Sequence, residues 1–144
     1  MLYFNKIKYM EKYMNLKDKA IDIKGKKYVL VSDRVLAFNE MYPKGSIITE
    51  LLTSTESVDG IKMFIVKATV KPEEGREFTG LAQEVVGEGY INKTSALENA
   101  ETSAVGRALA MMGIGVIDSI ASVDEINKAN NNLPGVNSGK ERKF

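Results

Sequence analysis

The sequence lacks three residue types that carry much of enzyme chemistry: cysteine, histidine and tryptophan are all absent. Without cysteine there is no disulfide, no thiolate zinc site and no cysteine nucleophile. Without histidine the chain lacks the usual general base, a common metal ligand and any Ser-His-Asp triad. We therefore expect a binding protein and not an enzyme, with neither a catalytic metal nor a cofactor.

Long apolar runs are also missing. None approaches the roughly 20 residues that span a bilayer, and residues 1–13 mix lysines with aromatic residues, unlike a signal peptide. We expect a cytoplasmic protein without a membrane segment. Met14 offers an alternative start, so that residues 1–13 are either a loose amphipathic helix or an upstream extension.

The charges are unevenly distributed along the chain. Residues 1–28 hold eight lysines and three acidic residues, whereas residues 29–101 hold seven basic and twelve acidic residues. A basic arm on a more acidic body suits a polyanionic partner, but a solubilising terminus explains it equally well. We divide the chain into a basic N-terminal arm (1–26), a single α+β domain (27–131) and a flexible polar tail (132–144).

The order of the expected elements favours an antiparallel meander. A strand is expected at residues 27–31, followed by a helix over 33–42 that Ser32 caps. Three β-branched segments separated by short turns come next: residues 46–55, 61–70 and 76–86. Strands joined by connections this short pair with their neighbours in an antiparallel way. A short helix is expected over residues 122–130.

The longest predicted helix covers residues 95–112. Ser95 and Glu98 have the spacing of a capping box, and Gly113 is a typical C-terminal stop. Gly106 inside the helix costs about 1 kcal/mol relative to alanine, which indicates a close contact there. The sequence therefore predicts an α+β fold, in which a three- to four-stranded antiparallel meander (a β-β-β-α core) packs against one long helix.

The segment GEGYINKT at residues 87–94 is a candidate binding loop. It places Tyr90, Asn92 and Lys93 before a helix N-terminus, where backbone donors and the helix dipole favour anions. Tyr90 offers a ring for base stacking and Lys93 a phosphate contact. The competing interpretation is a turn that glycine permits, with Tyr90 packed on the core.

Arg107 is the only basic residue of the long helix and lies among small residues. A guanidinium in that setting needs a carboxylate, a phosphate or a neighbouring subunit. Lys62 and Lys67, on the expected central strand, are weaker candidates for contacts with nucleic acid. A cluster of acidic residues in one hairpin turn is interpreted as solvated surface and not as a metal site: Glu73, Glu74 and Glu77.

The segment TSALENAETSAVGRALAMMGIG at residues 94–115 resembles a motif of the Erf/Sak-type phage recombination proteins. These belong to the single-strand annealing superfamily of Redβ, RecT and the eukaryotic Rad-type annealers. The pattern A-x-T-x-A-x-x-R-A-L followed by glycine is met by Ala100, Thr102, Ala104, Arg107, Ala108, Leu109 and Gly113. The resemblance covers roughly residues 28–130 and implies a β-β-β-α core.

This resemblance implies a protein that binds single-stranded DNA and anneals complementary strands without ATP in phage recombination. It would act in the bacterial cytoplasm as a homo-oligomeric ring or filament, with Arg107 on the DNA backbone. A phage exonuclease or host replication proteins would be its partners. Two alternatives stay open: a plain ssDNA-coating protein of OB type, and an interaction or assembly protein that contacts no DNA.

Overall fold

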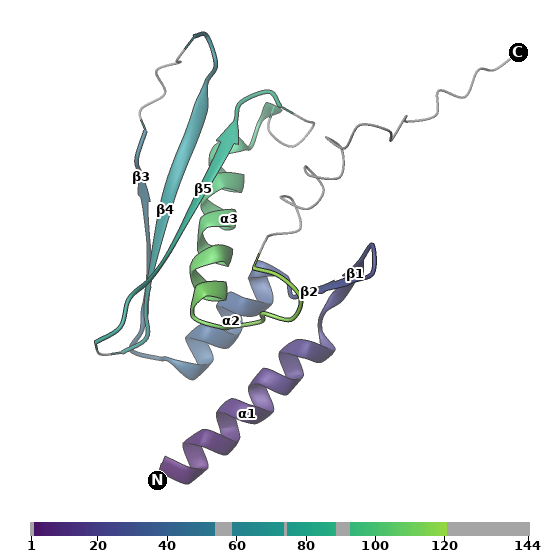
Figure 1. Cartoon of the computed structure of the whole chain (residues 1–144). Coiled ribbons are helices and arrows are strands. Elements are labelled where there is room, and N and C mark those ends of the chain that lie inside the picture. The colour runs from purple at the N-terminus through teal and green to yellow at the C-terminus, as the bar shows by residue number, and fades with distance from the viewer. Residues whose placement is uncertain (1, 54–58, 74, 89–92, 121–144) are drawn as a thin grey trace, which may run out of the picture.

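The computed structural model describes residues 2–53, 59–73, 75–88 and 93–120 (Figure 1). Its elements, in chain order, are α1 (Leu2–Asp18), β1 (Ile21–Ile23), β2 (Lys26–Tyr28), α2 (Val31–Met41), β3 (Ser46–Leu51), β4 (Met63–Lys71), β5 (Phe78–Val85) and α3 (Ala96–Met111). The strands β3, β4 and β5 form one antiparallel sheet in that order, and α3 packs against it. The predicted α+β meander with one long helix is thereby confirmed.

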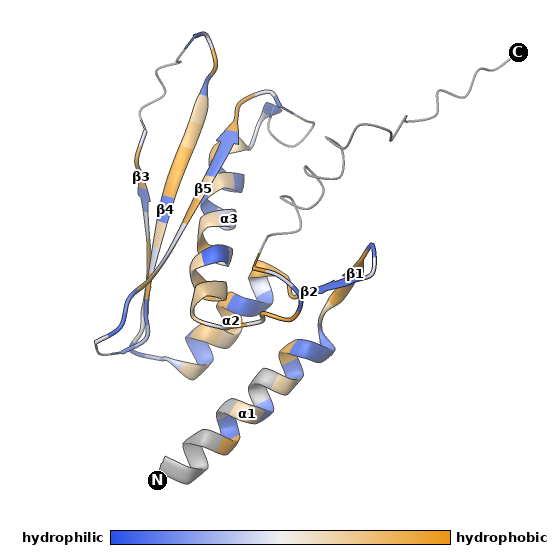
Figure 2. Cartoon of the chain, viewed as in Figure 1, coloured by the Kyte–Doolittle hydropathy of each residue, from blue (hydrophilic) through white to orange (hydrophobic). Residues whose placement is uncertain are grey.

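The central strand β4 is hydrophobic along much of its length, as Figure 2 shows. Alternate residues point to opposite faces of a strand, and Val66, Ala68 and Val70 are the buried set on β4. In the register of the sheet, Ala68 lies opposite Thr49 on β3 and Gly80 on β5. These positions define the inner face of the sheet, the face that α3 covers.

Small residues allow α3 to lie very close to this inner face. Ala100, Ala104 and Ala108 recur every four residues and are each 0% exposed. A Cβ atom at Gly80 would collide with the carbonyl oxygen of Ala104 and lie 2.5 Å from the amide nitrogen of Ala108. Backbone therefore meets backbone at this point, and the strand position requires glycine.

A second close contact joins α3 to the start of α2. A Cβ atom at Gly106 would lie only 2.6 Å from Cγ2 of Val31, which confirms the close contact expected at this glycine. The buried Arg34 strengthens the junction, because its Nε donates to the carbonyl of Val29 and its Nη1 to that of Gly106, both at 3.1 Å. Burial lowers the pKa of the Arg34 guanidinium below its ordinary value.

The side-chain capping interactions predicted for the starts of the two helices are not made. Helix α2 begins two residues early, with Leu30 at the N-cap position, so Ser32 lies inside the helix. Ser95 does hold the N-cap position of α3, but it makes no capping hydrogen bond. Its backbone has ψ near 30° and not the extended conformation of most N-caps, and its hydroxyl lies 3.5 Å from that of Thr94.

Two further differences concern the N-terminal part of the chain. The strand expected at residues 27–31 is the shorter β2, which pairs with β1 in a separate two-stranded hairpin and does not extend the meander. Strand β1 was not predicted, and α1 (Leu2–Asp18) is longer than the loose helix that was one of the two interpretations of residues 1–13. Leu16 of α1 is only 3% exposed and belongs to the hydrophobic core, so the end of this helix is packed against the body of the domain.

Several expectations fall outside the described residues. These are the helix over residues 122–130, the tail over residues 132–144, and the side chains of Tyr90 and Asn92. Among the residues that are described, no helix combines the length and the apolar character that crossing a membrane requires.

Candidate nucleic-acid interface

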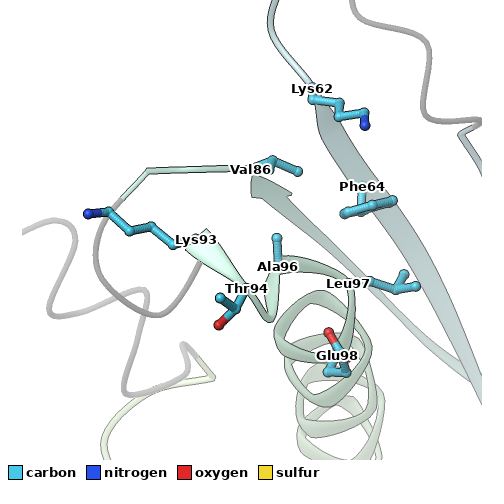
Figure 3. A pocket seen from close by; sticks show the side chains of 8 residues that line it. All are labelled: Lys62, Phe64, Val86, Lys93, Thr94, Ala96, Leu97 and Glu98. Atoms are coloured by element: carbon cyan, nitrogen blue, oxygen red, sulfur yellow. The ribbon is translucent and has the colours of Figure 1, made fainter.

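A pocket of about 290 Å³ opens where one end of the sheet meets the first turn of α3. Figure 3 shows the side chains around it, which come from β4, from the end of β5 and from the start of α3. Six of the lining residues give the pocket its charged, polar and apolar groups: Lys62, Phe64, Lys93, Thr94, Leu97 and Glu98. It is the place in the described fold where two of the predicted binding residues come together.

The sheet register brings these residues together although they lie far apart in the sequence. Lys62 precedes the first residue of β4, and its carbonyl accepts a hydrogen bond of 2.8 Å from the amide of Val86. This bond holds the start of β4 beside the end of β5. The chain then enters α3 directly after Lys93 and Thr94, so that the helix N-terminus lies beside the same end of the sheet.

The pocket has an apolar wall and a charged rim. Phe64 is half-buried and Leu97 is 39% exposed, so both present apolar surface to a ligand. Lys62 and Lys93 are exposed, and Figure 3 shows the Lys93 ammonium extending away from the Phe64 ring. The two cations therefore lie at separate points of the rim and suit separate contacts along an extended polyanion.

The first turn of α3 carries groups of both signs. Unpaired backbone amides and the positive end of the helix dipole favour an anion at this terminus, and the Thr94 hydroxyl adds a donor beside it. Glu98 lies in the same turn, where a carboxylate is itself favoured by the helix dipole. The arrangement can hold phosphate and sugar hydroxyl groups, but Glu98 opposes dense negative charge.

The other described candidates lie elsewhere. Lys67 alternates with the buried residues of β4 and thus lies on the sheet face away from α3. Arg107 is half-buried, with its Cβ close to Gly80 of β5, and it interacts with another part of the protein. Contacts of Lys67 and Arg107 with nucleic acid stay predictions, and neither residue lines the pocket.

Sequence reasoning did not single out the wall of this pocket. Phe64 belongs to an alternating strand pattern and Leu97 to an apolar helix stripe, and both patterns are typical of core positions. No local signal separates a pocket wall from a core position, because the pocket arises from the meeting of β4 and α3. Thr94 belongs to the candidate loop, but the residues predicted to bind there are Tyr90, Asn92 and Lys93.

Comparison with known protein families corrects the family resemblance. Residues 35–112, more than half of the chain, match the family described as Slr1353 N-terminal dsRNA-binding domain-like, which is not a phage annealing family. A comparison with curated proteins finds no match. The matched segment runs from the first turns of α2 through the sheet to the end of α3. The resemblance to Erf/Sak-type annealing proteins is therefore wrong, and the chain belongs to the Slr1353 N-terminal dsRNA-binding domain-like family.

Proposed function

We propose that this domain binds double-stranded RNA through the end of the sheet where the pocket meets the N-terminus of α3. The observation that carries the proposal is the family match over residues 35–112, from within α2 through the sheet to the end of α3. The name of the family indicates the class of ligand, and the two lysines of the pocket rim supply suitable chemistry at one place on the surface. We also propose that the role is binding without catalysis.

Binding of duplex RNA requires only a few types of contact from such a surface. Its wide minor groove displays 2′-hydroxyl groups and its backbone displays phosphates, so that recognition relies mostly on shape and not on base sequence. Lys62 and Lys93 can contact phosphates as point charges, and the Thr94 hydroxyl can hydrogen-bond a 2′-hydroxyl group or a phosphate. Catalytic groups are unnecessary for this task, which agrees with a chain that has neither histidine nor cysteine.

The charge of the surface limits the affinity that we expect. Two exposed lysines face the site while Glu98 lies on the same rim. Each phosphate that a cation neutralises contributes about 0.9 to the slope of log affinity against log salt concentration. Two such contacts give a slope of about −2, so binding at this surface is weak and only moderately sensitive to salt.

Fluorescence anisotropy with four labelled ligands of one sequence tests the proposal. The ligands are an RNA duplex of about 20 base pairs, the matching DNA duplex, a single strand of the RNA and a single strand of the DNA. We expect the RNA duplex to bind best, because its minor groove presents 2′-hydroxyl groups. Preferential binding of single-stranded DNA, equal binding of all four ligands, or no binding would each contradict the proposal.

Substitution at the rim locates the surface. The variant Lys62→Gln with Lys93→Gln should lower affinity for the RNA duplex by about tenfold and reduce the salt slope by about one for each lysine. Lys44→Gln is the matched control, because Lys44 is exposed and lies just before β3, at the opposite end of the β3–β4 pair. An equal loss for Lys44→Gln would show general charge attraction and not a local site.

A further inference from the structure

The outer face of the β3–β4–β5 sheet, which points away from α3, carries exposed apolar residues. The inner positions are known from their burial, so alternation assigns Ile48, Ile65 and Leu81 to the outer face. Ile48 is 53% exposed and Leu81 is 55% exposed. In the described part of the chain, α3 is the helix with extensive contacts to the sheet, and it lies on the inner face (Figure 1).

The charges of this outer face are balanced. Glu50 on β3 lies opposite Lys67 on β4 in the sheet register, and Lys71 at the end of β4 is paired with Glu77 at 2.6 Å. A neutral face with apolar residues is a poor match for a nucleic-acid backbone, which needs clustered positive charge. The outer face is instead complementary to a surface that has similar apolar residues and places a positive charge opposite each negative one.

A second copy of the same chain provides such a surface. A two-fold axis that runs along the strands, between β3 and β4, exchanges these two strands between the copies. Glu50 of each copy then lies opposite Lys67 of the other copy, and Leu52 lies opposite Ile65, because Leu52 and Ile65 are neighbours in the sheet. Such an isologous contact is complementary to itself in both charge and hydrophobicity.

We propose that the outer face of this sheet is a weak homodimer interface, in which Glu50 and Lys67 of two copies form reciprocal ion pairs beside an apolar contact. Three strands spaced by about 4.8 Å, each about eight residues long, give a face of roughly 400 Å² per copy. That is smaller than the roughly 800 Å² per partner of a stable interface. We therefore expect the dimer to be weak and transient, and to form only at high protein concentration.

This interface lies on the opposite face of the sheet from α3, so it leaves the pocket rim of each copy free. A dimer thus presents two copies of the proposed RNA-binding surface. The inference does not rest on RNA binding, since it depends only on the exposure, register and charge of the outer face.

Sedimentation velocity of the full chain over about 5–500 μM tests the proposal. We expect a monomer–dimer equilibrium that Ile48→Asp weakens at least tenfold. Leu36→Asp is the matched control, because Leu36 is 63% exposed on α2 and not on the sheet; it should leave the equilibrium unchanged. A chain that stays monomeric at all concentrations, or a dimer that only Leu36→Asp dissociates, would overturn the proposal.

Charge reversal tests the reciprocal pairing directly. Glu50→Lys and Lys67→Glu should each weaken the dimer several-fold, because each single change places like charges opposite one another. The double variant restores opposite charges and should recover most of the affinity. If circular dichroism shows that both single variants are folded and the double variant still fails to recover affinity, the proposed arrangement is overturned.

A measurement on the unmodified chain covers the case in which a variant fails to fold. In methyl NMR spectra, the signals of Ile48 and Ile65 should shift as protein concentration rises, while the Leu36 signals stay constant. Shifts at Leu36 without shifts at Ile48 and Ile65 would place the contact elsewhere and contradict the proposal.

Discussion

The two faces of the β3–β4–β5 sheet differ in a way that residue size alone does not anticipate. On the inner face the small residues Ala68 and Gly80 are buried under α3, whereas on the outer face the larger Ile48 and Leu81 stay exposed. Burial here depends on how closely backbone can approach backbone and not on the volume of each side chain. Large hydrophobic side chains therefore occur on the exposed outer face of this sheet as well as on the face that packs against α3.

The largest expected effect comes from two leucines with opposite burial. Leu109 of α3 is 0% exposed in the core, whereas Leu81 of β5 is mostly exposed on the outer face. Leu109→Ala should lower the free energy of unfolding by about 3 kcal/mol, since it leaves a cavity. Leu81→Ala should change it by less than about 0.5 kcal/mol. Urea denaturation at low protein concentration measures both, and similar losses would contradict the contrast between the faces.

A smaller effect is expected where the strand meets the helix backbone. Gly80→Ala adds one methyl group, but backbone atoms of Ala104 and Ala108 already occupy that space. Helix and sheet must move apart, and we expect a loss of about 2 kcal/mol in the free energy of unfolding. The matched control is Thr79→Ala, one residue earlier on the exposed face, which should cost less than about 1 kcal/mol. Equal costs for the two variants would show that the close approach of α3 is not required.

The sequence predicts the sheet and α3 well because their signals are local. β-branched segments separated by short turns determine the meander, and the contact required by Gly106 was expected from its position inside a helix. The N-terminal elements were harder to predict. Strand β1 has only three residues, Ile21–Ile23, and α1 has a weakly amphipathic, lysine-rich sequence.

The pocket and the family could not be predicted from local sequence patterns. Lys62 and Lys93 are 31 positions apart in the sequence, and only the pairing of β4 with β5 brings them to one pocket. The alanine motif that resembled annealing proteins includes three residues that are fully buried in the core: Ala100, Ala104 and Ala108. The alanines of this motif therefore reflect helix–sheet packing, which proteins with unrelated functions can share.

The smallest expected effect belongs to an exposed ion pair at the polar end of the outer face. Lys71 Nζ lies 2.6 Å from Glu77 Oε1, and this hydrogen bond and charge lower the pKa of the Glu77 carboxyl, with a minor contribution from the charge of Lys67. Since the folded-state pKa lies below the unfolded one, the pair stabilises the fold above the unfolded pKa of about 4.3. That stabilisation is lost as the pH falls through the folded-state pKa.

Thermal denaturation of Glu77→Gln between pH 7 and pH 3 measures this contribution. The melting temperature should fall slightly below that of the unmodified chain at pH 7, and the two should converge in acid, where Glu77 is protonated in both states. Added salt should reduce the difference at pH 7, because both side chains are exposed to solvent. Glu73→Gln removes an exposed charge from the same β4–β5 connection and should show no such convergence. If it did, the pH dependence would reflect the overall charge of the connection and not the pairing of Glu77 with Lys71.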